Sequence, residues 1–353
     1  ADPAPGAREQ DLLGSDRTDA PVISRLVVLH DDDLEVPRFT GRFLAGRNVI
    51  AHYHVRAGSA DDTARLARLL TGRAVGLALG GGGARGVAHV GAIRALRERG
   101  VPVDSVAGTS MGAIVAALYG AGYTTERMLE QIRTMFVDLN PFNDYTIPKY
   151  SILRGKKAEL AALRTFGRLH IEDLWVPFVC TSSNISRQAL AVHRTGSLSK
   201  AILATTALPG ITVPVIYDGD IHVDGGVMNN LPGDLIRSES AYLISCDVSP
   251  FEYVSVPSKR YPSPWTSMFR RPRFRATGDA AAIPAPSRAP GIGAILNAAM
   301  SAGSRQAASR VRDMSDLALT PPVGDIATLD FKRFAEIEQR GYEYTMRMLD
   351  AAE

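Results

Sequence analysis

A serine between two glycines is the feature of this sequence that most directly suggests chemistry. Residues 108–112 read Gly-Thr-Ser-Met-Gly and fit the pattern G-x-S-x-G around Ser110. In this pattern Gly108 and Gly112 leave room for a sharp strand-to-helix turn that exposes the serine hydroxyl. The positive end of the following helix favours negative charge beside that hydroxyl. Ser110 is therefore a candidate nucleophile for acyl transfer, and a plain glycine-rich turn is the alternative interpretation.

An acyl-transfer nucleophile needs hydrogen-bond donors for the oxyanion that it creates. Residues 80–86 read GGGGARG, and consecutive glycines let backbone N–H groups turn toward one point. The same stretch fits a dinucleotide-binding pattern through Gly81, Gly83 and Gly86, with Asp104 18 residues beyond the last of them. An oxyanion hole and a dinucleotide cradle both remain open at this point. A phosphate-binding P-loop is excluded because no Gly-Lys-Ser/Thr follows.

Ser110 also needs a general base. Three of the seven histidines follow the serine in the chain order that a Ser–acid–His triad requires, namely His170, His193 and His222. The stronger candidate is Asp224, at the expected end of a strand. Gly225 and Gly226 follow it and leave its backbone free to approach another loop closely. The alternative for Asp224 is an ordinary β-turn, because Asp-Gly is a common turn pair.

The segments around these motifs predict the fold that positions them. Residues 75–79 form a continuous apolar run, typical of a strand buried on both faces, and lead into the glycine stretch. Helical spacing follows, then a second short strand, the Ser110 turn and a second apolar helix. This alternation predicts an α/β fold with a mostly parallel central sheet. Further strands are expected at 176–181, 189–194, 213–217 and 242–247, and further helices at 198–206, 294–314 and 331–349.

Composition narrows the function classes. Lys and Arg total 40 against 37 for Asp and Glu, a balance that gives no indication of a nucleic-acid partner. The two cysteines, Cys180 and Cys246, exclude a disulfide scaffold and are expected to be buried thiols. No apolar stretch is long enough for a membrane-spanning helix.

The three motifs together resemble a known family. GGGARG at 81–86, GTSMG at 108–112 and DGG at 224–226 occur in the order and spacing of patatin-like phospholipases. The longer strings at 69–86, 204–214 and 223–232 are similar to the neuropathy target esterase branch of that family and its bacterial relatives. The resemblance covers roughly residues 60–349.

The resemblance implies a three-layer α/β/α fold and a Ser–Asp dyad that works without histidine. Ser110 would attack the ester carbonyl, and Asp224 would accept its proton. The oxyanion hole maps to Gly82 and Gly83, with Arg85 supporting the loop or the anion, whereas a solvent-exposed charge on the helix surface is the alternative for Arg85. Because an ordinary carboxylate is a weak base, the site must desolvate Asp224 or lower the pKa of the serine. The other motif glycines are Gly81, Gly86, Gly108, Gly112, Gly225 and Gly226.

The implied activity is hydrolysis of carboxylic esters in phospholipids or lysophospholipids through an acyl-serine, with no metal or organic cofactor. Two rival classes are a dinucleotide-binding protein, which leaves the serine and aspartate motifs unexplained, and a non-catalytic membrane module, against which the intact Ser110 and Asp224 argue. His89 is expected to pack in the core, and Asn229 and Asn230 to hold the turn after Asp224.

The expected organisation has four parts. Residues 1–21 are a flexible leader, 22–72 a β-β-α unit that adds to the sheet, and 73–349 the catalytic domain, with a proline- and arginine-rich insertion at 250–291. Within the insertion, basic and aromatic residues alternate over 259–275, which suits peripheral contact with an anionic membrane. We expect a cytoplasmic protein on the inner face of a membrane. The resemblance also implies regulatory cyclic-nucleotide-binding modules outside this chain.

Overall fold

The computed structural model describes residues 4–6, 9, 24–249 and 292–352, and the side chains from residue 302 onward in its last part. Most of the expected leader lies outside the described residues. The insertion at 250–291, with its expected membrane contact at 259–275, lies outside them entirely. Of the helices that the structure describes, none combines the length and hydrophobicity needed to cross a bilayer.

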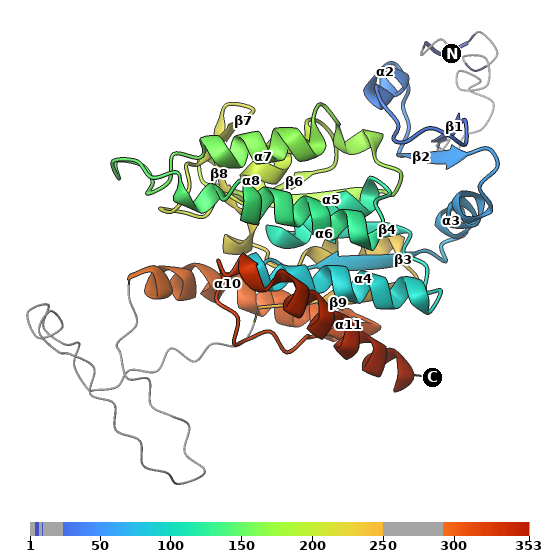
Figure 1. Ribbon diagram of the computed structural model, residues 1–353. Helices are drawn as coiled ribbons and strands as arrows, with labels where there is room; N and C mark the ends of the chain where they lie inside the picture. The colour runs from blue at the N-terminus through green and yellow to red at the C-terminus, as the bar shows by residue number, and fades with distance from the viewer. Residues whose placement is uncertain (1–3, 7–8, 10–23, 250–291, 353) are drawn as a thin grey trace, which may run out of the picture.

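A central sheet of eight strands organises the chain (Figure 1). Its order is β10-β9-β3-β4-β5-β8-β7, with β6 also paired to β5. The five strands from β10 to β5 are parallel, and β6, β7 and β8 join by antiparallel pairing. This arrangement confirms the expected mostly parallel α/β sheet. The strands are β3 (Val75–Leu79), β4 (Ser105–Gly108), β5 (Phe178–Asn184), β6 (Ala189–His193), β7 (Val215–Tyr217), β8 (Asp220–Asp224), β9 (Tyr242–Cys246) and β10 (Leu317–Leu319).

Helices cover both faces of this sheet, because successive strand residues point to opposite sides. Leu77 and Leu79 of β3 join a large core beneath α4, α5, α6 and α11. Ala78, between them, joins a second core with Ala308 and Val311 of α10 on the other face. The fold is therefore three-layered. Its helices are α4 (Ala88–Glu98), α5 (Met111–Gly120), α6 (Thr125–Arg133), α7 (Lys156–Phe166), α8 (Leu198–Thr205), α10 (Ile292–Met314) and α11 (Phe334–Asp350).

Two glycines let α11 cross very close to α4, the helix that follows the glycine loop. A Cβ at Gly91 would stand 2.0 Å from the carbonyl oxygen of Glu338, and one at Gly341 would stand 2.1 Å from that of Ala88. No side chain fits at either distance, so the helix backbones themselves are in contact. The chain between β10 and α11 is thereby held near the start of α4.

The N-terminal unit forms a sheet of its own, so the expectation that it adds to the central sheet is wrong. β1 (Arg25–His30) and β2 (Ala51–Arg56) pair in parallel, with α2 (Thr40–Leu44) between them and α3 (Ala60–Leu70) after them. Both edges of β3, the nearest strand along the chain, are already paired with β9 and β4. The unit instead contacts the domain of the central sheet through side-chain hydrogen bonds, for example that of the Trp175 indole N–H to the carbonyl oxygen of Glu35 at 2.9 Å.

Candidate active site

Ser110 occupies the tight turn between β4 and α5. Its backbone has φ 54° and ψ −124°, a left-handed conformation that a non-glycine residue seldom adopts. A Cβ at Gly112 would lie 2.2 Å from the carbonyl oxygen of Leu79, and one at Gly108 would lie 2.5 Å from the Cα of Ala113. Both glycines of the G-x-S-x-G motif are therefore required by close backbone contacts, and the turn forces the serine outward.

A threonine that the sequence did not single out supports this turn. Thr205, the last residue of α8, accepts the backbone N–H of Ser110 on its Oγ1 at 2.9 Å. Thr109, next to the serine, donates its hydroxyl to the carbonyl oxygen of Asn229 at 2.9 Å. Hydrogen bonds to two separate segments thus fix a backbone that is strained on its own.

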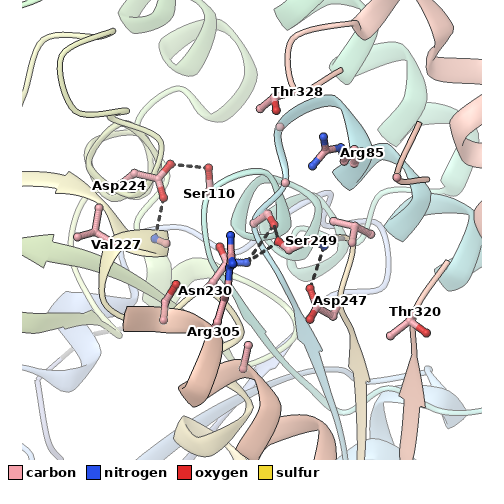
Figure 2. Close-up of a pocket in the computed structure, with 18 of the residues that line it drawn as sticks. Arg85, Ser110, Asp224, Val227, Asn230, Asp247, Ser249, Arg305, Thr320 and Thr328 are labelled. Atoms are coloured by element: carbon pink, nitrogen blue, oxygen red, sulfur yellow. Dashed lines mark hydrogen bonds between the residues drawn. The ribbon is translucent and has the colours of Figure 1, made fainter. Parts of the chain in front are cut away.

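Asp224 lies directly opposite the serine, at the end of β8 (Figure 2). Ser110 donates its hydroxyl to Oδ2 of Asp224 at 2.7 Å, and the backbone N–H of Gly226 donates to Oδ1 at 2.7 Å. The aspartate is only 5 % exposed. Burial raises its pKa to about 6, although the hydrogen bonds from Ser110 and Gly226 act in the opposite direction. The carboxylate is thus desolvated and more basic than an ordinary aspartate.

The two glycines after Asp224 have steric roles. A Cβ at Gly225 would stand 2.4 Å from the carbonyl oxygen of Thr181 on β5, and one at Gly226 would stand 2.7 Å from Oδ1 of Asn230. Only glycine allows the chain to turn this closely against the neighbouring strand. The turn leaves the Gly226 N–H directed at the carboxylate.

The glycine loop after β3 lies against Ser110. A Cβ at Gly81 would approach the Cβ of Ser110 to 3.1 Å. The N–H of Gly80 is bonded to the carbonyl oxygen of Cys246, and that of Gly81 to the carbonyl oxygen of Asn230. Within the described part of the chain, the structure gives no acceptor for the N–H groups of Gly82 and Gly83. The resemblance drawn from the sequence places the oxyanion hole at these two amides.

Arg85 and the chain after β10 hold this loop from outside. Arg85 is 9 % exposed and donates its Nε–H to the carbonyl oxygen of Ile326 at 2.7 Å, so the alternative that it is a solvent-exposed surface charge is wrong. A Cβ at Gly83, whose φ is 58°, would stand 2.2 Å from the carbonyl oxygen of Thr328. At Gly86 a Cβ would lie 2.5 Å from Cγ of Met111. The loop is therefore clamped between the serine turn and a segment more than 240 residues later.

Two further side chains hold the loop from within. His89 is fully buried and its Nε2 lies 2.8 Å from the carbonyl oxygen of Gly80, to which the neutral ring donates. Burial lowers the pKa of His89 to about 4, so the ring is uncharged at neutral pH. Asn230 donates its Nδ2–H to the carbonyl oxygen of Gly81 at 3.2 Å and to Oγ of Ser249 at 2.8 Å. His89 is a core residue as expected, and its bond to the loop is an addition.

None of the candidate histidines completes a catalytic triad with Ser110. All seven histidines lie in the described residues, and none has a hydrogen bond to Ser110 or Asp224. His193 and His222 both contact Oγ of Ser182 instead, at 2.7 Å each. The hydroxyl of Ser110 has a carboxylate partner in place of an imidazole.

The position of Asp104 also contradicts the dinucleotide-binding alternative. Asp104 precedes β4, at the end of the sheet opposite to the glycine loop that follows β3. Its carboxylate is completely buried, bonded to the guanidinium of Arg68 at 2.8 and 2.9 Å and to the N–H of Val75 at 2.9 Å. It is therefore unavailable to a ribose beside the loop.

A cavity of about 760 Å³ opens in front of Ser110 and Asp224. Its walls mix apolar residues with polar and basic ones, as ligand pockets do. Figure 2 shows Arg85, Arg305 and Asn230 around the same space. No cluster able to hold a metal ion occurs among the residues that the structure describes. Beyond the loops described above, the lining includes Leu208, Pro209, Val227, Asp247, Ser304, Arg305, Ala308, Arg312, Pro321 and Pro322.

Fold and site together define a three-layer α/β protein with a serine–aspartate pair beside a glycine loop. Residues 77–235 match the family model for patatin-like phospholipase, and the chain belongs to that family.

Relatives named as lipid hydrolases are similar over most of the chain. The human "Patatin-like phospholipase domain-containing protein 6" is 34% identical over 297 residues, which is 82% of this chain and 21% of that protein. "Lysophospholipase NTE1" of Mycosarcoma maydis is 34% identical over 306 residues, 84% of this chain and 16% of that protein. The chain thus spans about a fifth of the length of these relatives. VipD from Legionella pneumophila aligns with a TM-score of 0.43 and 13% identity, covering 79% of this chain and 67% of that one, which is too distant to add to the description of the fold.

Proposed function

We propose that this chain is a serine hydrolase of lipid carboxylic esters, in which Ser110 is the nucleophile and Asp224 its base. The observation that carries the proposal is the 2.7 Å hydrogen bond from the Ser110 hydroxyl to the buried Asp224 carboxylate, at the floor of a cavity of about 760 Å³. Family membership supports the same chemistry.

Acylation begins with attack of Ser110 Oγ on the ester carbonyl carbon, while its proton passes to Oδ2 of Asp224. The raised pKa of Asp224 brings its basicity nearer to neutral pH, where a general base works best. Negative charge then develops on the carbonyl oxygen, and the N–H groups of Gly82 and Gly83 are placed to donate to it. Collapse of the tetrahedral intermediate breaks the ester C–O bond, and the leaving oxygen takes the proton back from Asp224.

Deacylation repeats these steps with water. Asp224 removes a proton from a water molecule that attacks the acyl-Ser110 carbonyl carbon. The same amides stabilise the second oxyanion. Its collapse breaks the bond to Ser110 Oγ, which regains the proton, and the fatty acid leaves. No step requires a histidine.

The substrates that we propose are phospholipids or lysophospholipids. The names of the relatives support this class. The cavity supports it as well, because apolar residues such as Leu208, Pro209 and Val227 suit an acyl chain and the arginines suit a phosphate. We also propose that the protein acts at the cytoplasmic face of a membrane. Regulation by cyclic-nucleotide-binding modules outside this chain is a further proposal.

The test combines turnover with covalent labelling. Wild type, Ser110→Ala and Asp224→Asn are assayed on p-nitrophenyl butyrate and lysophosphatidylcholine, and the intact mass is measured after exposure to a fluorophosphonate. We expect wild type to hydrolyse both esters and to gain one adduct at Ser110, whereas both variants fold and lose turnover. Activity that persists in Asp224→Asn would place the base elsewhere, and absence of both adduct and turnover in wild type would refute the proposal.

A further inference from the structure

An exposed apolar loop between α6 and α7 lies outside the chemistry described so far. Residues 145–153 fold back on themselves: Tyr145 and Leu153 form an isolated β-bridge, and the N–H of Thr146 donates to the carbonyl oxygen of Ile152. Ile147, at the tip, is 87% exposed, Tyr150 is 74% exposed and Tyr145 is 66% exposed. In Figure 1 it is the green loop that reaches out to the left of the coloured chain.

The loop has one inward and one outward side. Ser151 and Leu153 are buried, and Ser151 donates its hydroxyl to the carbonyl oxygen of Leu153 at 2.7 Å. The alternate residues Tyr150 and Ile152 face outward. Large apolar side chains that are exposed together are informative, because such patches mark interaction sites. This loop is anchored by its inner side and presents its apolar side to the surroundings.

The anchor connects the loop to the wall of the cavity. The N–H groups of Ile152 and Leu153 donate to the carbonyl oxygens of Gly210 and Ile211. These residues directly follow Leu208 and Pro209, which line the cavity beside Ser110. Val213, two residues further on, is 41% exposed and extends the apolar surface. Two backbone hydrogen bonds therefore join the loop to the segment that forms part of the cavity wall.

The charges around the loop are mostly positive. Residues 144–157 contain four basic side chains and one acid. The acid, Asp144, is mostly buried and accepts the N–H of Lys157. Lys149 lies over the ring of Tyr150, 5.2 Å from its centre, and Arg154 and Lys156 are exposed. Aliphatic and aromatic residues bordered by lysine and arginine suit the interface of an anionic bilayer.

We propose that residues 145–152 form an interfacial docking loop that inserts into an anionic phospholipid surface and brings the cavity to it. The inference rests on the proposed lipid hydrolase function, since it explains how an ester in a bilayer reaches Ser110. A second copy of the chain is the other class of partner for an apolar face. The basic border favours the lipid surface, because like charges on two identical loops would repel.

Binding is tested without turnover, on the full chain carrying Ser110→Ala. Flotation is measured with vesicles of phosphatidylcholine containing about 30% phosphatidylserine. The double variant Ile147→Asp, Tyr150→Asp is expected to bind about tenfold more weakly or worse. The matched control is Ile50→Asp, Leu70→Asp. It changes two exposed apolar residues of the N-terminal unit, at the other end of the molecule in Figure 1, and is expected to bind like the parent.

Activity and oligomeric state separate the possible outcomes. In the active background, the loop variant should keep its turnover of soluble p-nitrophenyl butyrate and lose turnover of lysophosphatidylcholine held in vesicles. Unchanged vesicle binding by the loop variant, or equal loss in the control, would overturn the inference. So would conversion of an oligomer to a monomer by the loop variant in light scattering, with vesicle binding intact. Absence of all ester turnover would refute the proposed function, while the binding measurement would still decide the role of the loop.

Discussion

Replacing Asp224 by asparagine should make the folded protein more stable at neutral and alkaline pH. Burial raises the pKa of this carboxyl from 3.8 to about 6, and a shift of about two units corresponds to about 3 kcal/mol. The folded state therefore holds the proton more tightly than the unfolded state. It follows that stability is lost as the pH rises from about 4 to about 6, and the full cost is present above about pH 6.

Asparagine removes that cost and keeps the shape of the site. Its Oδ1 still accepts the N–H of Gly226, and its Nδ2 donates to Oγ of Ser110. We expect Asp224→Asn to exceed wild type by up to about 3 kcal/mol in free energy of unfolding at about pH 8, and to match it at about pH 4. Urea unfolding followed by circular dichroism at several pH values measures this difference. In wild type, kcat/KM for a soluble ester should rise with pH and level off above about 6.

The difference in unfolding free energy between variant and wild type is free of the contributions from other titrating groups, because these are the same in both proteins. Buried histidines make such a contribution, and it changes with pH in the opposite direction to that of Asp224. The pKa values of His54, His89 and His193 are each lowered to about 4 by burial. These rings cost stability as the pH falls below about 6.5, whether or not residue 224 ionises.

The control is Asp220→Asn on the same strand. Hydrogen bonds from Asn184 and Arg187 lower the pKa of Asp220, so this variant should lose stability at neutral pH. If Asp224→Asn is less stable than wild type at about pH 8, or if its advantage does not change with pH, burial is not the cause of the shift and the reasoning fails.

Two further substitutions test how the loops are held. Gly83→Ala brings a Cβ to 2.2 Å from the Thr328 carbonyl oxygen, so we expect a lower melting temperature and a fall in kcat/KM of about a hundredfold or more. The control is Gly100→Ala, at a position with a similar φ and open space, which should lose only about 1 kcal/mol of unfolding free energy and keep full activity. Equal effects of the two substitutions would contradict the steric argument. Thr205→Val leaves the Ser110 N–H without its acceptor. We expect the free energy of unfolding, measured in urea, to fall by about 1–3 kcal/mol, and esterase activity to fall with it. Thr205→Ser should restore both stability and activity, and failure to do so would assign the effect to packing.

Local sequence patterns predicted the elements around Ser110 well, because strand, glycine turn and helix are encoded by consecutive residues. The sequence placed Asp224 at the end of a strand but gave no bounds for that strand, β8, since its apolar residues are few. A signal was available: Asp218 and Gly219, with φ 51° and 83°, form the two-residue turn that joins β7 to β8. The three-residue β10 offers no periodicity to read.

Two of the supports of the site, Thr205 and the chain around Thr328, could not be read from the sequence, because they lie far along the chain from the residues that they hold. The clamp of Thr328 on Gly83 and the bond of Thr205 to Ser110 exist only once the sheet has brought these residues together. By contrast, Ser110, Asp224 and the glycine loop each stand in a short motif. Short motifs thus point to the groups proposed to react, whereas the residues that position those groups become evident only in the folded structure.

The left-handed backbone of Ser110 and the burial of Asp224 have a consequence for laboratory evolution. Both features are unfavourable to the fold on their own, and the proposed reaction is what would maintain them. A library of variants sorted for heat resistance alone would therefore enrich glycine at position 110 and neutral side chains at position 224. The most thermostable variants of that library would lack activity. A search for a more stable form of this protein must therefore select for turnover at the same time.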